Sequence, residues 1–139
     1  MDKNSTKEFI NKAIEKTKAG ELDWSILSAT VNLKPLPEDD SGILKLGAFD
    51  ALYQSYSYYS RYGNGEILLL VFSGNSILVS PPDNCFLSLR MQDARSKYAV
   101  EVENNKHDTD TAIMLSRLYN LIDKDVSSVN SLINDFLNS

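Results

Sequence analysis

The chain has 139 residues, a mass of 15.6 kDa and a formal net charge of −5, with 42% hydrophobic and 24% charged residues. These values are typical of one globular domain, and we expect residues 1–139 to form a single domain. One cysteine and one histidine exclude a disulfide framework, a multi-cysteine zinc site and a two-histidine metal site.

The N-terminal segment predicts an amphipathic helix. Ser5 followed by Glu8 fits a capping box, and Gly20 stands where such a helix ends. Its apolar residues recur at helical spacing: Phe9, Ile10, Ala13, Ile14 and Thr17. Trp24 follows shortly after, and we expect it to pack back onto this helix.

The middle of the chain predicts extended structure. Val31 and Leu33 alternate like a strand until Pro35 and Pro37 break the pattern, and Ile43–Leu46 could form a short strand. Gly63-Asn64-Gly65 is a strong hairpin signal, and Cys85–Gln92 alternates apolar and polar residues. The expected strands are Ala51–Tyr62, Glu66–Phe72, Ile77–Val79, Cys85–Gln92 and Lys97–Glu103. Short turns between strands favour antiparallel pairing, so these segments predict a meander of about five strands.

Two helices are expected after the strands. Asp108 or Thr109 can cap the first, and the short link Lys124–Val126 predicts a helical hairpin folded onto the sheet. The second repeats its apolar residues at helical spacing: Val129, Leu132, Ile133, Phe136 and Leu137. The predicted fold is therefore α+β, with an antiparallel meander packed against one N-terminal and two C-terminal helices.

No set of catalytic residues is predicted. Cys85 lies on the apolar face of its strand, which is typical of a structural thiol, and His107 is the only base that could activate it. No G-x-S-x-G elbow and no phosphate-binding glycine loop occurs. We therefore expect a protein that is not an enzyme and has no cofactor.

Metal binding is kept as an alternative. His107, Asp108 and Asp110 could hold a weak divalent ion, although a helix cap accounts for the same residues. Acids and lysines of the types that a magnesium nuclease needs are also present: Asp83, Glu101, Glu103, Lys97 and Lys106. A metal-dependent hydrolase or nuclease is therefore one alternative function, while no metal site is predicted.

The unusual feature is a concentration of tyrosine in one segment. The residues are Tyr53, Tyr56, Tyr58, Tyr59 and Tyr62. In a strand, Tyr56, Tyr58 and Tyr62 would face one side and Tyr53 and Tyr59 the other, so a two-layer fold cannot bury them all. Tyrosine is enriched in binding hot spots, and we interpret this strand as a partner-binding surface. Strand addition is a variant if the strand forms a sheet edge.

The leading hypothesis is a non-enzymatic protein-interaction module that binds a macromolecular partner, expected to be another protein. An acidic inhibitor of a host defence or nucleic-acid-binding protein, acting by nucleic-acid mimicry, is an alternative, as is a homodimer using the same tyrosines. The pI near 4.8 argues against binding nucleic acid. The polar segment Met1–Lys7 and the lack of an apolar run of about 20 residues predict a cytoplasmic protein without a membrane span.

Segments near the two ends of the chain resemble segments of other proteins. Lys7–Trp24, with Glu-Phe-Ile and Thr-Lys-Ala-Gly-Glu-Leu-Asp-Trp, resembles the start of small uncharacterised single-domain proteins of Gram-positive bacteria and their mobile elements. Leu115–Ile122 and Phe136 are similar to the closing helices of those proteins. The resemblance implies a bacterial or phage setting, which also fits the abundance of asparagine and lysine over arginine, and it brings no functional residues.

Overall fold

The computed structural model describes residues 2–40, 49, 51–74, 84–126 and 129–139. The predicted strand Ile77–Val79 and the segment Ile43–Leu46 lie outside these ranges. The elements follow the chain in this order: α1 (Lys3–Lys18), β1 (Trp24–Ile26), the 3-10 turns η1 (Pro37–Asp40) and η3 (Gln54–Tyr56), β2 (Tyr58–Tyr62), β3 (Gly65–Ser73), β4 (Cys85–Asp93), β5 (Val100–Asn104), α2 (Thr109–Val126) and α3 (Val129–Leu137). The predicted α+β class is confirmed.

The described strands form one antiparallel sheet in the order β1-β2-β3-β4-β5, which confirms the predicted meander. At the β2–β3 hairpin, Tyr62 pairs with Gly65 across a two-residue loop. Gly63 opens that loop with φ of +57°, a conformation that favours glycine. Strand β1 was not predicted, because three residues are too few to show an alternating pattern.

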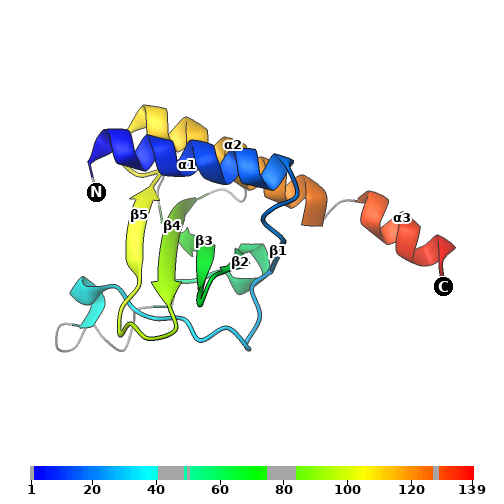
Figure 1. The fold of residues 1–139 in the computed structure, drawn as a ribbon, viewed down its shortest axis with the longest axis horizontal. Helices are drawn as coiled ribbons and strands as arrows, with labels where there is room; N and C mark the ends of the chain where they lie inside the picture. Colours follow the sequence, from blue (N-terminus) through cyan, green and yellow to red (C-terminus); the bar gives the residue numbers. More distant parts are fainter. Residues whose placement is uncertain (1, 41–48, 50, 75–83, 127–128) are drawn as a thin grey trace.

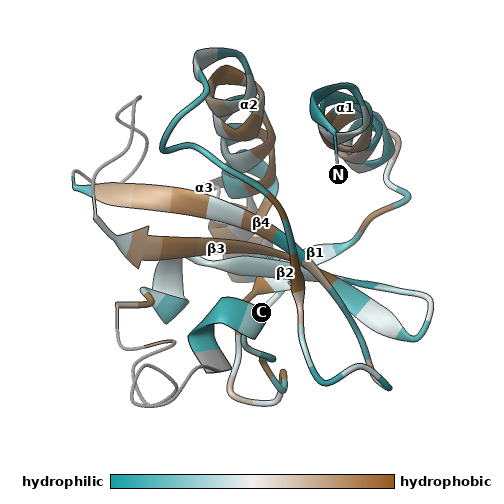
Figure 2. Cartoon of the chain, turned by 90° about the vertical axis from the view of Figure 1, so that its left-hand side faces the viewer, coloured by the Kyte–Doolittle hydropathy of each residue, from teal (hydrophilic) through white to brown (hydrophobic). Residues whose placement is uncertain are grey.

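Helices α1 and α2 lie side by side over one face of the sheet (Figure 2). The core between helices and sheet includes Ile10, Leu69, Leu89, Leu115 and Leu118. Trp24 is buried there, and its indole nitrogen donates to the Thr17 hydroxyl at 2.9 Å. The expected packing of Trp24 against the preceding helix is therefore confirmed.

The two helix starts use aspartates as caps. Helix α1 begins at Lys3, and Asp2 Oδ1 accepts from the Ser5 backbone N–H at 2.8 Å. The prediction of Ser5 as the N-cap was thus wrong, because Asp2 provides an equivalent acceptor three residues earlier. At α2, Asp108 Oδ2 accepts from the Thr111 backbone N–H at 2.9 Å, as a cap requires.

A second core lies on the opposite face of the sheet, beneath the segment between β1 and β2. It contains Leu27, Val31, Leu68, Leu70 and Phe72. The buried Gln92 side chain ties this segment to the sheet by accepting from the Lys34 backbone N–H at 3.0 Å and donating to the Asn32 carbonyl at 2.8 Å. Both faces of β3 are consequently covered, which explains its continuous apolar run.

Helix α3 lies beyond the end of α2 and away from the sheet (Figure 1). The predicted helical hairpin is not formed, because α2 continues through Lys124–Val126 and includes the residues expected to turn. None of the described helices is long and apolar enough to cross a membrane.

Candidate functional site

The five tyrosines of the predicted contact surface occupy different environments. The strand begins only at Tyr58, so the expected alternation holds for Tyr58, Tyr59 and Tyr62 but not for the residues before them. Tyr53 and Tyr56 instead flank or belong to η3, where their rings meet edge to face with centroids 6.3 Å apart. The single tyrosine surface expected from the sequence is therefore divided.

Tyr58 cannot belong to a contact surface in this conformation, because it is 1% exposed. Its hydroxyl donates to Asp123 Oδ1 at 2.5 Å, and its ring lies 5.5 Å from that of Tyr119. Tyr59 is half-buried and packs against the second core. Tyr53, Tyr56 and Tyr62 are 42–51% exposed and remain available to a partner.

The sheet edge beside these tyrosines is β1. This strand pairs with Tyr58–Ser60, so β2 is covered over those residues and strand addition there is blocked. The three residues of β1 form a short edge, which offers little template for a further strand.

Helix α3 carries a large exposed apolar surface. The side chains of Leu132, Ile133, Phe136 and Leu137 are between 49% and 77% exposed. Their spacing places them along one stripe of the helix. We call these four residues the α3 stripe.

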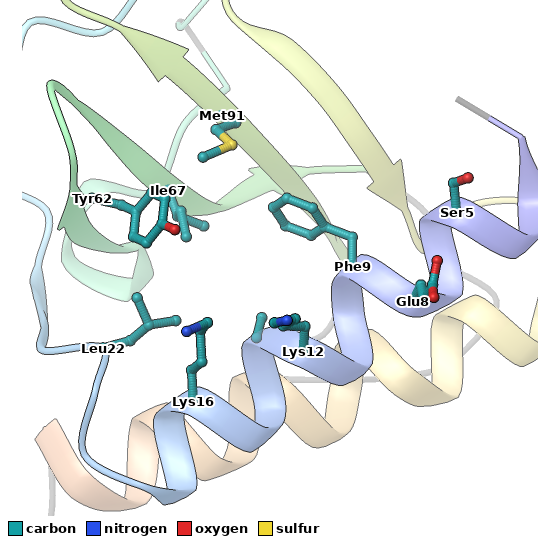
Figure 3. Close-up of a pocket in the computed structure, with 10 residues that line it drawn as sticks. Ser5, Glu8, Phe9, Lys12, Lys16, Leu22, Tyr62, Ile67 and Met91 are labelled. Atoms are coloured by element: carbon teal, nitrogen blue, oxygen red, sulfur yellow. The ribbon is translucent and has the colours of Figure 1, made fainter.

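An elongated groove lies between α1 and the sheet (Figure 3). One cavity of about 440 Å³ is lined by Phe9 of α1, Leu22, Tyr62 of β2, Ile67 of β3 and Met91 of β4. A second cavity of about 610 Å³ continues it under the hairpin ends, since both share Phe9, Tyr62 and Met91. We call this joint feature the α1 groove.

The α1 groove combines an apolar floor with a charged rim. Lys12 and Lys16 lie along its α1 side with Glu8 and Ser5, and Figure 3 shows both lysine side chains beside the cavity. Lys16 also pairs with Glu21 at 3.4 Å. Such a groove suits an amphipathic ligand that buries apolar groups and presents an acidic group to the rim.

A buried polar cluster lies on the opposite face of the sheet. Arg90 Nε donates to Ser88 Oγ at 2.9 Å, and Ser88 Oγ donates to Glu101 Oε2 at 2.5 Å. The Arg90 guanidinium lies 4.9 Å from the centre of the Phe72 ring, and burial lowers its pKa. Arg90 Nη1 is buried without a hydrogen-bond partner among the described residues, and neither of the two cavities described above is lined by Ser88, Arg90 or Glu101.

Two of the three residues considered for a weak metal site, Asp108 and Asp110, have structural partners. Asp108 caps α2 and pairs with Lys3 at 2.9 Å, while Asp110 pairs with Lys7 at 3.4 Å. Hydrogen bonding from the Thr111 backbone lowers the pKa of Asp108 to about 2. His107 is exposed. Across the described ranges, no three His, Cys, Asp or Glu side chains are grouped as a metal site would require.

The described residues of magnesium-nuclease type all have partners within the fold. Asp83 lies outside the described residues, and Glu101 is bonded to Ser88 and Asn104. Lys106 Nζ lies 3.9 Å from the centre of the Phe86 ring. Cys85 is buried in the core under the helices, as expected for a structural thiol.

Sequence reasoning identified the apolar stripe of α3 but not its exposure, and it did not identify the α1 groove. The groove draws residues from α1, the following loop and three strands, so no local motif marks it. Phe9 is the sequence signal that could have indicated the groove. It lies at the edge of the apolar stripe of α1 and extends that stripe to the side of the helix that lines the groove. Comparisons with protein-family models, curated proteins and solved structures find no match.

Proposed function

We propose that this protein is a non-enzymatic interaction module that binds another protein through the α3 stripe. The observation that carries the proposal is the exposure of Leu132, Ile133, Phe136 and Leu137 on one short helix. A helix that presents such a stripe is the standard element of helix-in-groove recognition. Bacterial or phage origin remains part of the proposal, on the basis of the chain-end resemblance.

The energetics of α3 support this assignment. Fully burying one large apolar side chain contributes about 1.5–3 kcal/mol, so the four residues leave a substantial stabilisation unused. Isolated helices shorter than about 12–15 residues are marginal in water, and α3 has 9 residues. A partner that covers the stripe would therefore stabilise both the helix and the complex.

The exposed tyrosines extend the proposed contact. The Tyr119 hydroxyl of α2 donates to the Tyr56 carbonyl at 2.8 Å, which holds η3 under the second half of the helix that leads into α3. Tyr53 and Tyr56, whose rings meet edge to face at η3, are therefore held beside the helix that precedes α3. We propose that a partner seated on the α3 stripe also contacts these two rings, which supply rigid apolar area at low entropic cost.

Site-specific photo-crosslinking tests the proposal. A photoreactive phenylalanine analogue replaces Phe136 in the full chain, which is expressed in the cell that makes the protein. The control carries the analogue in place of Glu38, an exposed residue of η1, which lies outside the α3 stripe. The proposal predicts discrete cross-linked proteins from position 136 alone, and identical patterns from both positions would contradict it.

Salt dependence separates this proposal from nucleic-acid mimicry. Exposed charges are screened strongly above about 0.5 M salt, so a charge-based mimic should lose its partner there. Apolar contacts of the α3 stripe should survive the same salt. Cross-linking from position 136 that disappears at high salt would favour the acidic inhibitor instead.

A further inference from the structure

We propose that the partner of α3 includes a second copy of this chain, with the α3 stripe of one copy bound in the α1 groove of the other. The inference rests on the proposed function, because it takes α3 as the binding element. Reciprocal exchange of α3 between two copies would give a closed two-fold dimer in which both apolar surfaces are buried.

The two surfaces match in length. Ser5 and Lys16, which line the two ends of the α1 side of the groove, are separated by about 16 Å at the helical rise per residue. The nine residues of α3 span about 13 Å at the same rise. Phe9, Ile67 and Met91 give the groove an apolar lining that can receive side chains of the α3 stripe.

The two surfaces also have complementary charge. Helix α1 carries five lysines and two glutamates, whereas residues 123–139 carry three aspartates and one lysine. Asp135 lies next to the α3 stripe on the helix surface, so it would border the face that a docked α3 buries. A docked α3 would bring Asp135 to the lysine rim, where Lys12 is the candidate partner because Lys16 pairs with Glu21.

The groove of the same chain is a poor site for its own α3. Lys3 and Lys7 of α1 pair with Asp108 and Asp110 at the start of α2, while Phe9, Lys12 and Lys16 line the groove on a different flank of α1. Only residues 127 and 128 separate α2 from α3, and they can span about 11 Å between Val126 and Val129. In Figure 1, α3 continues away from the body and does not turn back toward α1.

Sedimentation equilibrium of the purified full chain gives the first test. We expect a concentration-dependent dimer, with L132S/F136S raising its dissociation constant at least about tenfold. The matched control is Ile113→Ser, which removes an exposed apolar side chain from α2. Since these residues are exposed, the variants should keep the wild-type circular dichroism spectrum. A monomer at all concentrations, or a dimer that L132S/F136S leaves unchanged, would overturn the inference.

Directed disulfide formation gives the second test. One preparation carries Asp135→Cys and another carries Lys12→Cys, and the two are mixed before oxidation. We expect a mixed disulfide between the preparations that is absent when Glu38→Cys replaces Lys12→Cys. A double variant that forms only the intramolecular disulfide would show that α3 occupies its own groove and would overturn the inference.

The proposed function and the second-copy inference can be contradicted independently of each other. A monomeric chain whose position 136 cross-links to a different protein would overturn the second-copy inference and leave the proposed function intact. A dimer that depends on the α3 stripe but forms no mixed disulfide at Lys12 would overturn docking in the α1 groove alone. A dimer insensitive to α3, together with equal cross-linking from positions 136 and 38, would contradict both proposals.

Discussion

The hydroxyl of Tyr58 donates to Asp123 at 2.5 Å, joining the start of β2 to the last turns of α2. Tyr58 is thus an anchor of the helix that leads into α3, and not a surface residue. Tyr119 lies against the same ring and donates to the Tyr56 carbonyl. These contacts fix the direction in which α2 leaves the body, and therefore where α3 begins.

Tyr58→Phe should lower the free energy of unfolding by about 1–2 kcal/mol, because it removes the donor to Asp123 while keeping the ring. Urea denaturation of the purified variant measures this change. Tyr62→Phe is the matched control, since that side chain is about half exposed, and it should change the stability by less than about 0.5 kcal/mol. Equal effects of the two variants would contradict the anchoring role of Tyr58.

Alkaline pH should destabilise the fold through Tyr119. Burial, together with the neighbouring Tyr58 and Asp123, raises the pKa of Tyr119 above its ordinary value near 10. The unfolded chain therefore loses this proton first, so stability is complete below about pH 10 and falls as the pH rises above it. Unfolding followed by circular dichroism should show a shallower loss above pH 10 in Tyr119→Phe than in the wild type, and equal slopes would contradict this cause.

The cap of α2 should control stability in acid. The pKa of Asp108 is lowered to about 2 by the Thr111 backbone N–H, below the value of about 3.9 in an unfolded chain. Its stabilisation is therefore complete above about pH 4 and is lost as the pH falls toward 2. Asp108→Asn should keep the cap at pH 7 but lose this acid slope, whereas Asp108→Ala should be less stable at both pH values. Thermal unfolding between pH 2 and 7 checks both variants.

A glycine is required at position 65, because the backbone there lies close to the backbone of β4. A Cβ at Gly65 would lie 1.9 Å from the Gln92 carbonyl oxygen, so Gly65→Ala must displace backbone and should cost about 2–3 kcal/mol. Gly63→Ala meets no atom within 4 Å and should cost about 1–2 kcal/mol from its positive φ alone. Urea denaturation distinguishes the two, and a smaller loss for Gly65→Ala would contradict the packing of the hairpin.

Local patterns predicted much of this fold. Gly63-Asn64-Gly65 identified the β2–β3 hairpin, and the alternation from Cys85 identified the face that meets the helices. These signals are local, because a turn conformation or a two-residue period is encoded by adjacent residues.

The remaining features depend on contacts between distant segments. Arg90 and Gln92 occupy polar positions of the alternating strand β4, yet they are buried, because Leu27, Val31 and other described residues before β2 pack on that face of the sheet. Tyr53 and Tyr56 look like strand residues but fall in a 3-10 turn. The α1 groove and the exposure of α3 depend on how helices are placed, which no local sequence pattern specifies.

The most direct test of the central claim is hydrogen exchange of the amides Ile133–Leu137. It is measured in the complex that is cross-linked through the phenylalanine analogue at position 136. The account predicts at least about tenfold slower exchange there than in the L132S/F136S chain, because the covered helix no longer frays. Exchange at the same rate in both samples would mean that α3 stays uncovered and would contradict its role as the contact.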